Sequence, residues 1–178
     1  MSTINPVKLL LLALLIATAL GGCNKRAGLQ IGDVIPDVTL TDFQGKSVSL
    51  PKDIKGKIAL LRFWGVDCCF CDKEILLSLE PLYQKYKDRE FMPVAINESR
   101  TDKTDERLKK FAHLTYPMLI DEYGLVAKQF GVIGLPTTFI IDEEGIVRDK
   151  ITGEAGIEEF EKRFTTILNK GVFYENGH

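Results

Sequence analysis

The sequence has little of what would place the protein among nucleic-acid-binding, membrane-spanning or disulfide-scaffold proteins. Its 178 residues carry 23 basic and 25 acidic side chains, a net charge of −2, without a basic stripe, so nucleic acid is not an expected partner. Its longest apolar run, residues 9–20, is shorter than the about 20 residues that cross a bilayer. Three of its four cysteines fall within residues 68–71, whereas a disulfide scaffold spreads its cysteines along the chain.

The first residues predict export. Lys8 precedes the apolar run, and the sequence LGGC, which ends at Cys23, follows it, as in a signal peptide. LGGC resembles the lipobox of bacterial lipoproteins, in which the cysteine is lipidated and becomes the mature N-terminus. Cleavage after Ala19 is the alternative, because it fits the rule of small residues at that point. We expect a signal peptide over residues 1–22, a lipidated tether over residues 23–32 and a location in the bacterial cell envelope, facing the periplasm or the extracellular side.

The chain after this leader predicts one α/β domain over residues 33–171 and a C-terminal tail over residues 172–178, because strand and helix patterns alternate. Glycine-containing turns separate two pairs of strands, which predicts hairpins. Pro81 should kink or divide the first helix. The predicted strands are residues 38–40, 47–50, 57–64, 91–96, 118–120, 137–141 and 146–148, and the predicted helices are residues 72–83, 105–112, 125–130 and 157–168.

The most informative feature is the sequence Cys68-Cys69-Phe70-Cys71, which follows a predicted strand and opens a predicted helix. A C-x-x-C pair at such a junction is typical of redox motifs. A thiol at a helix N-terminus can have a pKa of roughly 3.5–7.5 rather than about 8.5, so the reactive thiolate is populated at neutral pH. The alternatives are a structural disulfide, inert buried thiols or half of a metal site. We expect redox chemistry at this motif.

Two segments resemble proteins of the thioredoxin fold. Trp64 stands four residues before the first cysteine of the C-x-x-C pair, as in their active-site segment, and residues 131–139 resemble the loop whose cis-proline, here Pro136, faces the dithiol. The opening residues 32–50 and the extra segment over residues 97–117 resemble the exported TlpA/ResA branch. The resemblance implies a thioredoxin-like fold, with a central mixed sheet flanked by helices, an N-terminal β-hairpin and a central insertion.

The resemblance also implies the roles of individual residues. Cys68 would attack a partner disulfide and Cys71 would resolve the mixed disulfide, with no cofactor and no metal. Glu74, three residues after Cys71, would handle protons, although glutamate is also common in a first helical turn. A cis Pro136 would leave the backbone of Leu135 free to pair with an extended substrate. The expected substrate-binding residues are Leu135, Pro136, Thr137 and Trp64.

Three positions depart from the thioredoxin pattern. Arg62 lies on the strand before the motif, where thioredoxins carry a buried acid. An unpaired buried guanidinium is very costly, so Arg62 must reach solvent or find a carboxylate. Family geometry makes Glu74 the nearest candidate, and such a pair would support the thiolate of Cys68. Asp67 replaces a second tryptophan and could cap the helix. Cys69 is either a spare thiol or a third redox or metal-binding participant.

We therefore expect an exported thiol-disulfide oxidoreductase that acts on proteins carrying a disulfide or dithiol, with a membrane electron donor and membrane attachment through Cys23. The resemblance to the TlpA/ResA branch implies that it acts as a reductant, with apocytochrome c before haem attachment among its candidate substrates. One alternative is a copper carrier, since clustered thiolates suit Cu(I), but such carriers resemble C-x-x-x-C with a late histidine. The other is a peroxiredoxin, whose motif P-x-x-x-[ST]-x-x-C is absent.

Overall fold

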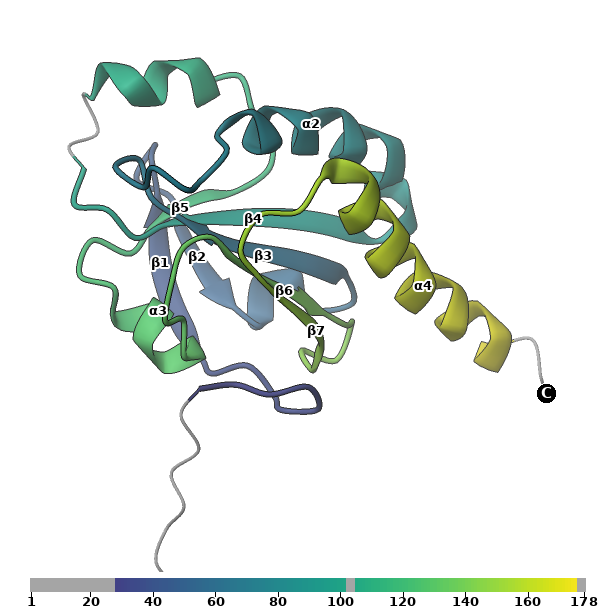
Figure 1. Ribbon diagram of the computed structural model, residues 1–178. Helices are drawn as coiled ribbons and strands as arrows, with labels where there is room; N and C mark the ends of the chain where they lie inside the picture. Colours follow the sequence, from purple (N-terminus) through teal and green to yellow (C-terminus); the bar gives the residue numbers. More distant parts are fainter. Residues whose placement is uncertain (1–27, 102–104, 176–178) are drawn as a thin grey trace, which may run out of the picture.

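The computed structural model describes residues 28–101 and 105–175 (Figure 1). Cys23 with its predicted lipid, the predicted signal peptide, most of the tether and residues 176–178 lie outside this part of the chain. Within the described ranges, no helix is long and apolar enough to cross a membrane. The expectations that concern the leader therefore stay predictions.

A seven-stranded mixed sheet forms the centre of the domain. Its strands are β1 (Val38–Asp42), β2 (Ser47–Leu50), β3 (Ile58–Trp64), β4 (Phe91–Asn97), β5 (Met118–Ile120), β6 (Thr137–Ile141) and β7 (Val147–Thr152). Their order across the sheet is β2-β1-β5-β4-β3-β6-β7. β3 and β4 are parallel, whereas β6 runs antiparallel to β3 and joins β7 in the predicted hairpin. The β1–β2 hairpin joins the sheet through β5.

Helices cover both faces of the sheet. The α-helices are α2 (Glu74–Tyr86), α3 (Leu125–Phe130) and α4 (Ile157–Glu175), and the 3-10 helices are η1 (Lys52–Ile54), η2 (Lys87–Arg89) and η3 (Glu106–Phe111). α2 and α4 lie on one face and α3 on the other (Figure 1). Side chains of β3 alternate between the two faces. Leu60 and Trp64 join the core beneath α2 and α4, whereas Leu61 and Phe63 join the core against α3.

The expected α/β architecture with its N-terminal hairpin is confirmed, and several details differ. α2 continues through Pro81, because its apolar face packs on the sheet on both sides of the proline, so the helix is not divided. The insertion contains the 3-10 helix η3 in place of an α-helix, a common form for short connections. α4 continues to Glu175, past the expected helix end at Leu168. The peptide bond before Pro136 is cis, as predicted, and so is the bond before Pro51, which we did not predict.

The first described residues are fixed to the end of α3 by a close backbone contact. The N–H of Leu29 donates to the carbonyl oxygen of Phe130 at 3.0 Å, and a Cβ on Gly131, whose φ is 70°, would overlap with the Cα of Gly28.

Gly131→Ala should therefore cost left-handed strain of roughly 1–2 kcal/mol and a backbone clash in addition. Gly56→Ala is the matched control, because Gly56 has a φ of 76° and open space around it. Urea unfolding should show a clearly larger loss for Gly131→Ala, and equal losses would contradict the contact.

Candidate active site

The loop between β3 and α2 carries a disulfide between Cys68 and Cys71, whose Cα atoms are 5.4 Å apart. Cys68 is half-buried, whereas Cys71 is only 5% exposed. Cys69 is an exposed free thiol. The two cysteines of the C-x-x-C motif thus face each other as expected, and Cys68 is the one of the pair that a partner can reach.

The N-terminus of α2 is displaced from the cysteines. α2 begins at Glu74, whose N–H donates to the side chain of Asp72 at 2.9 Å, so Cys68 lies in a turn ahead of the helix. The prediction that the motif opens the helix is therefore wrong, because Asp72 satisfies the first free N–H of the helix and starts it there. Asp67 does not cap the helix either, since its carboxylate pairs with Arg107 of η3 at 2.6 Å.

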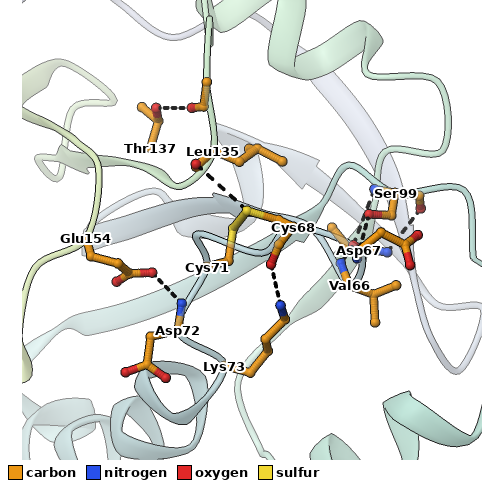
Figure 2. Close-up of a disulfide and its surroundings, with 12 residues drawn as sticks. Val66, Asp67, Cys68, Cys71, Asp72, Lys73, Ser99, Leu135, Thr137 and Glu154 are labelled. Carbon is orange, nitrogen blue, oxygen red and sulfur yellow. Dashed lines mark hydrogen bonds between the residues drawn. A yellow bond between two sulfur atoms is a disulfide. The ribbon is translucent and has the colours of Figure 1, made fainter.

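The loop before β6 faces the disulfide. Cys68 Sγ lies 3.8 Å from the carbonyl oxygen of Leu135, which precedes the cis peptide bond to Pro136 (Figure 2). A Cβ on Gly65 would lie 3.2 Å from a methyl carbon of Leu135 and 3.3 Å from the Cβ of Cys68, so the two loops meet at this glycine without spare room. On the other side, Lys73 Nζ donates to the carbonyl oxygen of Cys68. The structure thus brings Cys68, Leu135 and Pro136 together, as the sequence predicts.

Two predicted substrate residues lie beneath the surface. Trp64 is buried and packs edge-on against Phe111, with ring centroids 5.4 Å apart. Thr137 is buried, and its hydroxyl donates to the loop backbone at 2.7 Å (Figure 2). Both side chains support the loops from below in this structure, and their contact with a substrate stays a prediction. The exposed apolar side chains of the two loops are Phe70, 78% exposed, and Ile133, 93% exposed. The sequence analysis did not identify these two residues, although a large apolar residue in a turn that cannot bury it is a usable signal of a binding surface.

Asn97, at the end of β4, fixes the residues ahead of Cys68. Its buried side-chain oxygen accepts the N–H of Val66 at 3.1 Å and the N–H of Ser99 at 3.3 Å. Ser99 Oγ in turn accepts the N–H of Asp67 at 3.5 Å. The buried amide thereby ties the cysteine loop to the neighbouring strand. Sequence reasoning missed this residue, although a polar residue that ends a run of core residues is a usable signal.

Arg62 is fully buried beneath the cysteine loop and pairs with Glu154 instead of Glu74. Its Nη2 donates to both carboxylate oxygens of Glu154, at 2.6 and 2.7 Å, and its Nη1 donates to Thr138 at 3.3 Å. Glu74 is exposed, and its carboxylate lies 3.4 Å from Nζ of Lys110. The predicted Arg62–Glu74 pair is therefore wrong, because Glu74 faces η3 whereas Arg62 meets the loop after β7. The alternative that Arg62 reaches solvent is excluded by its burial.

Comparison with known proteins shows the family and the fold of the chain. Residues 31–150 match the model of the AhpC/TSA family. The chain belongs to the AhpC/TSA family. The chain is 38% identical over 147 residues to the thiol-disulfide oxidoreductase ResA of Bacillus cereus, covering 83% of this chain and 84% of that protein. It is 36% identical over 143 residues to the thioredoxin-like protein YneN of Bacillus subtilis, covering 79% and 82% of the two chains. The crystal structure of StoA from Bacillus subtilis has a TM-score of 0.60 and 25% identity, and the match covers 74% of this chain and 99% of that one.

These relatives identify the enzyme class and the fold of this AhpC/TSA-family protein. It is a thiol-disulfide oxidoreductase of the ResA-like kind, with a thioredoxin-like fold, as the motifs predict. The Cys68–Cys71 disulfide is present as the redox-active group that such chemistry needs. Among the residues that the structure describes, no group of three histidine, cysteine, aspartate or glutamate side chains is arranged to hold a metal ion.

Glu98 is a carboxylate near the site whose ionisation the fold disfavours. It follows β4, and its N–H donates to the carbonyl oxygen of Trp64 at 2.8 Å. Burial of the side chain, together with the negative charge of Asp121, raises the pKa of Glu98 above its usual value. The folded protein therefore binds a proton at Glu98 more readily than the unfolded chain does.

Glu98→Gln should raise the free energy of unfolding at neutral pH. Because the folded-state pKa of Glu98 is raised, its contribution to stability is fully present below the unfolded pKa, about 4.3, and is lost as the pH rises through the folded pKa. The gain from glutamine should therefore be largest near pH 7 and vanish near pH 3, as measured by urea unfolding at both values. Glu106→Gln, at an exposed position, should show no such gain. A loss of stability at pH 7 would contradict the assigned burial of the Glu98 carboxylate.

Proposed function

We propose that Cys68 and Cys71 are the redox pair of this enzyme, with Cys68 as the nucleophile and Cys71 as the resolving cysteine. The observation that supports these roles is their unequal access. Cys68 is half-buried beside the loop of Leu135, whereas Cys71 is almost fully buried. A partner sulfur can therefore approach Cys68 first. Glu74, exposed at the first turn of α2, is assigned to proton exchange with solvent.

In the reducing direction, the Cys68 thiolate attacks one sulfur of a partner disulfide, which forms a mixed disulfide and releases the other partner sulfur as a thiolate. The Cys71 thiolate then attacks Cys68 Sγ, which forms the Cys68–Cys71 disulfide and releases the second partner sulfur. Two electrons pass from the enzyme to the partner, and the protons lost by the two cysteines balance those taken up by the partner thiolates. A donor dithiol at the membrane then reduces the enzyme disulfide by the same exchange.

We assign substrate binding to the loop before β6 and to the surface beside Cys68. Pro136 has no N–H of its own and its neighbour Leu135 presents a carbonyl oxygen to the site, so the loop can pair with an extended segment by strand addition. Phe70 and Ile133 add exposed apolar side chains to the two loops. This combination suits a partner whose cysteine lies in an extended segment with apolar neighbours.

We further propose that the protein acts as a reductant of exported proteins, with apocytochrome c before haem attachment as a candidate. The direction rests on the resemblance to the TlpA/ResA branch. The test is reduction of insulin and of a disulfide-bonded cytochrome c haem-site peptide, together with the reduction potential. A potential near about −270 mV supports a reductant and one near about −120 mV an oxidant. Stable Cu(I) binding, or peroxide consumption, without disulfide reduction would replace the proposal by a copper carrier or a peroxidase.

We propose that Cys23 carries lipid that holds the protein at the bacterial membrane, with the domain on the periplasmic or extracellular side. The support is the LGGC sequence after the apolar run of residues 9–20. Cys23→Ser should abolish labelling by a fatty-acid probe and move the protein from the membrane fraction to the soluble fraction, because firm anchoring takes more than one acyl chain. Mature protein that begins at Leu20 would instead show ordinary signal-peptide cleavage.

A further inference from the structure

An ion pair between the buried Arg62 and the partly exposed Glu154 lies beneath the disulfide, and Glu154 also accepts a hydrogen bond from the backbone of the disulfide loop. Glu154 Oε1 accepts Arg62 Nη2 at 2.6 Å. The same oxygen accepts the N–H of Asp72, the residue directly after Cys71, also at 2.6 Å (Figure 2). The carboxylate therefore connects β3, at the centre of the sheet, to the loop that carries the disulfide.

The surroundings of the Arg62 side chain are apolar. Arg62 lies on β3 between Leu60 and Trp64, on the face whose core also includes Cys71. Its guanidinium carbon lies 5.6 Å from the centre of the Phe160 ring. The Arg62 side chain is fully buried and that of Glu154 is 31% exposed. Because charges interact more strongly where the effective dielectric constant is low, a charge that forms on either sulfur is subject to both members of the pair.

A second observation indicates that this face of β3 favours negative charge. Arg62 Nε and Trp64 Nε1 are buried donors with no acceptor in the part of the chain that the structure describes. Both belong to the same strand and lie two residues apart, so they share a face of the sheet. Donor groups without acceptors stabilise a nearby anion, and a cysteine thiolate is an anion that forms next to this face when the disulfide is reduced.

We propose that the Arg62–Glu154 pair sets the reduction potential of the Cys68–Cys71 couple, with Arg62 favouring the dithiol form and Glu154 opposing it. The inference rests on the proposed function of the two cysteines. Reduction adds two electrons from a donor dithiol, breaks the S–S bond and adds two protons, or one proton where a sulfur remains a thiolate. A cation stabilises that thiolate and an anion destabilises it. The two members of the pair are positioning residues with opposite effects.

Substitution of each member should therefore shift the potential in opposite directions. Glu154→Gln keeps the shape and one acceptor oxygen but leaves the Arg62 charge uncompensated. Equilibration with a glutathione buffer should favour the dithiol about tenfold more, a potential about 30 mV more positive. Arg62→Met removes the cation, so the potential should become more negative by a similar amount. The rate at which iodoacetamide alkylates Cys68 at neutral pH should rise in the first variant and fall in the second. Glu154→Asp, which keeps the charge, should rescue both values.

All variants are made in a Cys23→Ser/Cys69→Ser background, so that Cys68 and Cys71 are the only cysteines left to titrate. Glu161→Gln is the matched control, because the Glu161 side chain is 32% exposed and accepts from Lys85 at 2.7 Å and from Tyr86 at 2.6 Å, near the other end of α2. It should leave the potential unchanged. The charged residues of the loop, Asp67, Asp72 and Lys73, and Glu74 at the start of α2 are common to all variants and cancel in the comparison.

If the reduction potentials of Glu154→Gln and Arg62→Met shift in the same direction, the inference is overturned. A purely structural role of the pair gives no reason for the two substitutions to have opposite effects. An unchanged potential in folded Glu154→Gln protein would also overturn the inference. If Arg62→Met fails to fold, the reduction potentials of Glu154→Gln and Glu154→Asp still test the inference. Only Glu154→Gln removes the carboxylate charge, so only its potential should shift. Failure of the proposed function would look different: the wild-type protein itself would show no reversible dithiol–disulfide equilibrium.

Discussion

Cys68→Ser protein should lose its disulfide-reductase turnover by at least about a thousandfold, because the variant has no nucleophile for the first step. Cys71→Ser should also lose turnover, for a different reason. Its Cys68 still attacks the partner, but no second thiolate is present to resolve the mixed disulfide. The variant should therefore accumulate covalent adducts with insulin or with a haem-site peptide, visible by mass spectrometry under non-reducing conditions and absent in the Cys68→Ser/Cys71→Ser double variant.

Cys69→Ser is the control for these two variants, because Cys69 lies between them in the sequence, is exposed and forms no disulfide in the structure. It should retain most of the wild-type turnover. If Cys69→Ser is as inactive as Cys68→Ser, the assignment of Cys68 and Cys71 as the redox pair is wrong, and the adjacent thiol takes part in the exchange.

The second large effect should appear in stability. Glu154→Ala should lower the free energy of unfolding of the oxidised protein by about 3 kcal/mol, the lower end of the range for breaking a buried ion pair. The lower end applies because the Glu154 side chain is partly exposed, so some water already reaches the pair. The loss has two sources: the guanidinium of Arg62 stays buried without its counter-charge, and the N–H of Asp72 loses its acceptor.

The double variant Arg62→Leu/Glu154→Ala should be more stable than Glu154→Ala alone, since no charge is left stranded and a leucine suits the apolar face of β3. The coupling free energy between the two positions should lie between about 0.5 and 3 kcal/mol. Urea unfolding of the four oxidised proteins measures both quantities. Strict additivity would show that the two side chains do not depend on each other for stability.

Local sequence patterns predicted most of the architecture because they follow from burial and turn chemistry. The apolar run of β3 and the turn in the β6–β7 hairpin each lie within a few residues of sequence. The need of Arg62 for a carboxylate also followed from its place on a buried strand. The identity of the residue that pairs with Arg62 could not be predicted in this way, because it depends on which residues of neighbouring strands lie opposite one another. Arg62 lies opposite Thr138 on β6, and Thr138 lies opposite Ile151 on β7. Only this arrangement brings the loop that contains Glu154 within reach.

The corrections at the site have a common physical cause. The prediction assigned Trp64 and Thr137 to substrate binding, but a thioredoxin-like loop needs side chains beneath it as well as above it. Trp64 and Thr137 fill the space below, whereas Phe70 and Ile133 lie outside. The start of α2 was misplaced for a similar reason, because the side chain of Asp72 forms a local hydrogen bond that competes with an earlier helix start.

The Arg62–Glu154 pair also constrains how the sequence can change over evolution. The two positions are 92 residues apart in the chain, yet loss of Glu154 strands a cation that cannot reach water. Loss of Arg62 leaves a carboxylate that can. Substitution of Arg62 first, or of both residues together, should therefore be tolerated better than substitution of Glu154 first. Descendants that keep Arg62 while replacing Glu154 should carry another acid on the same loop, and an alignment of close relatives should show Glu154 replaced only where Arg62 is also replaced or such an acid is present.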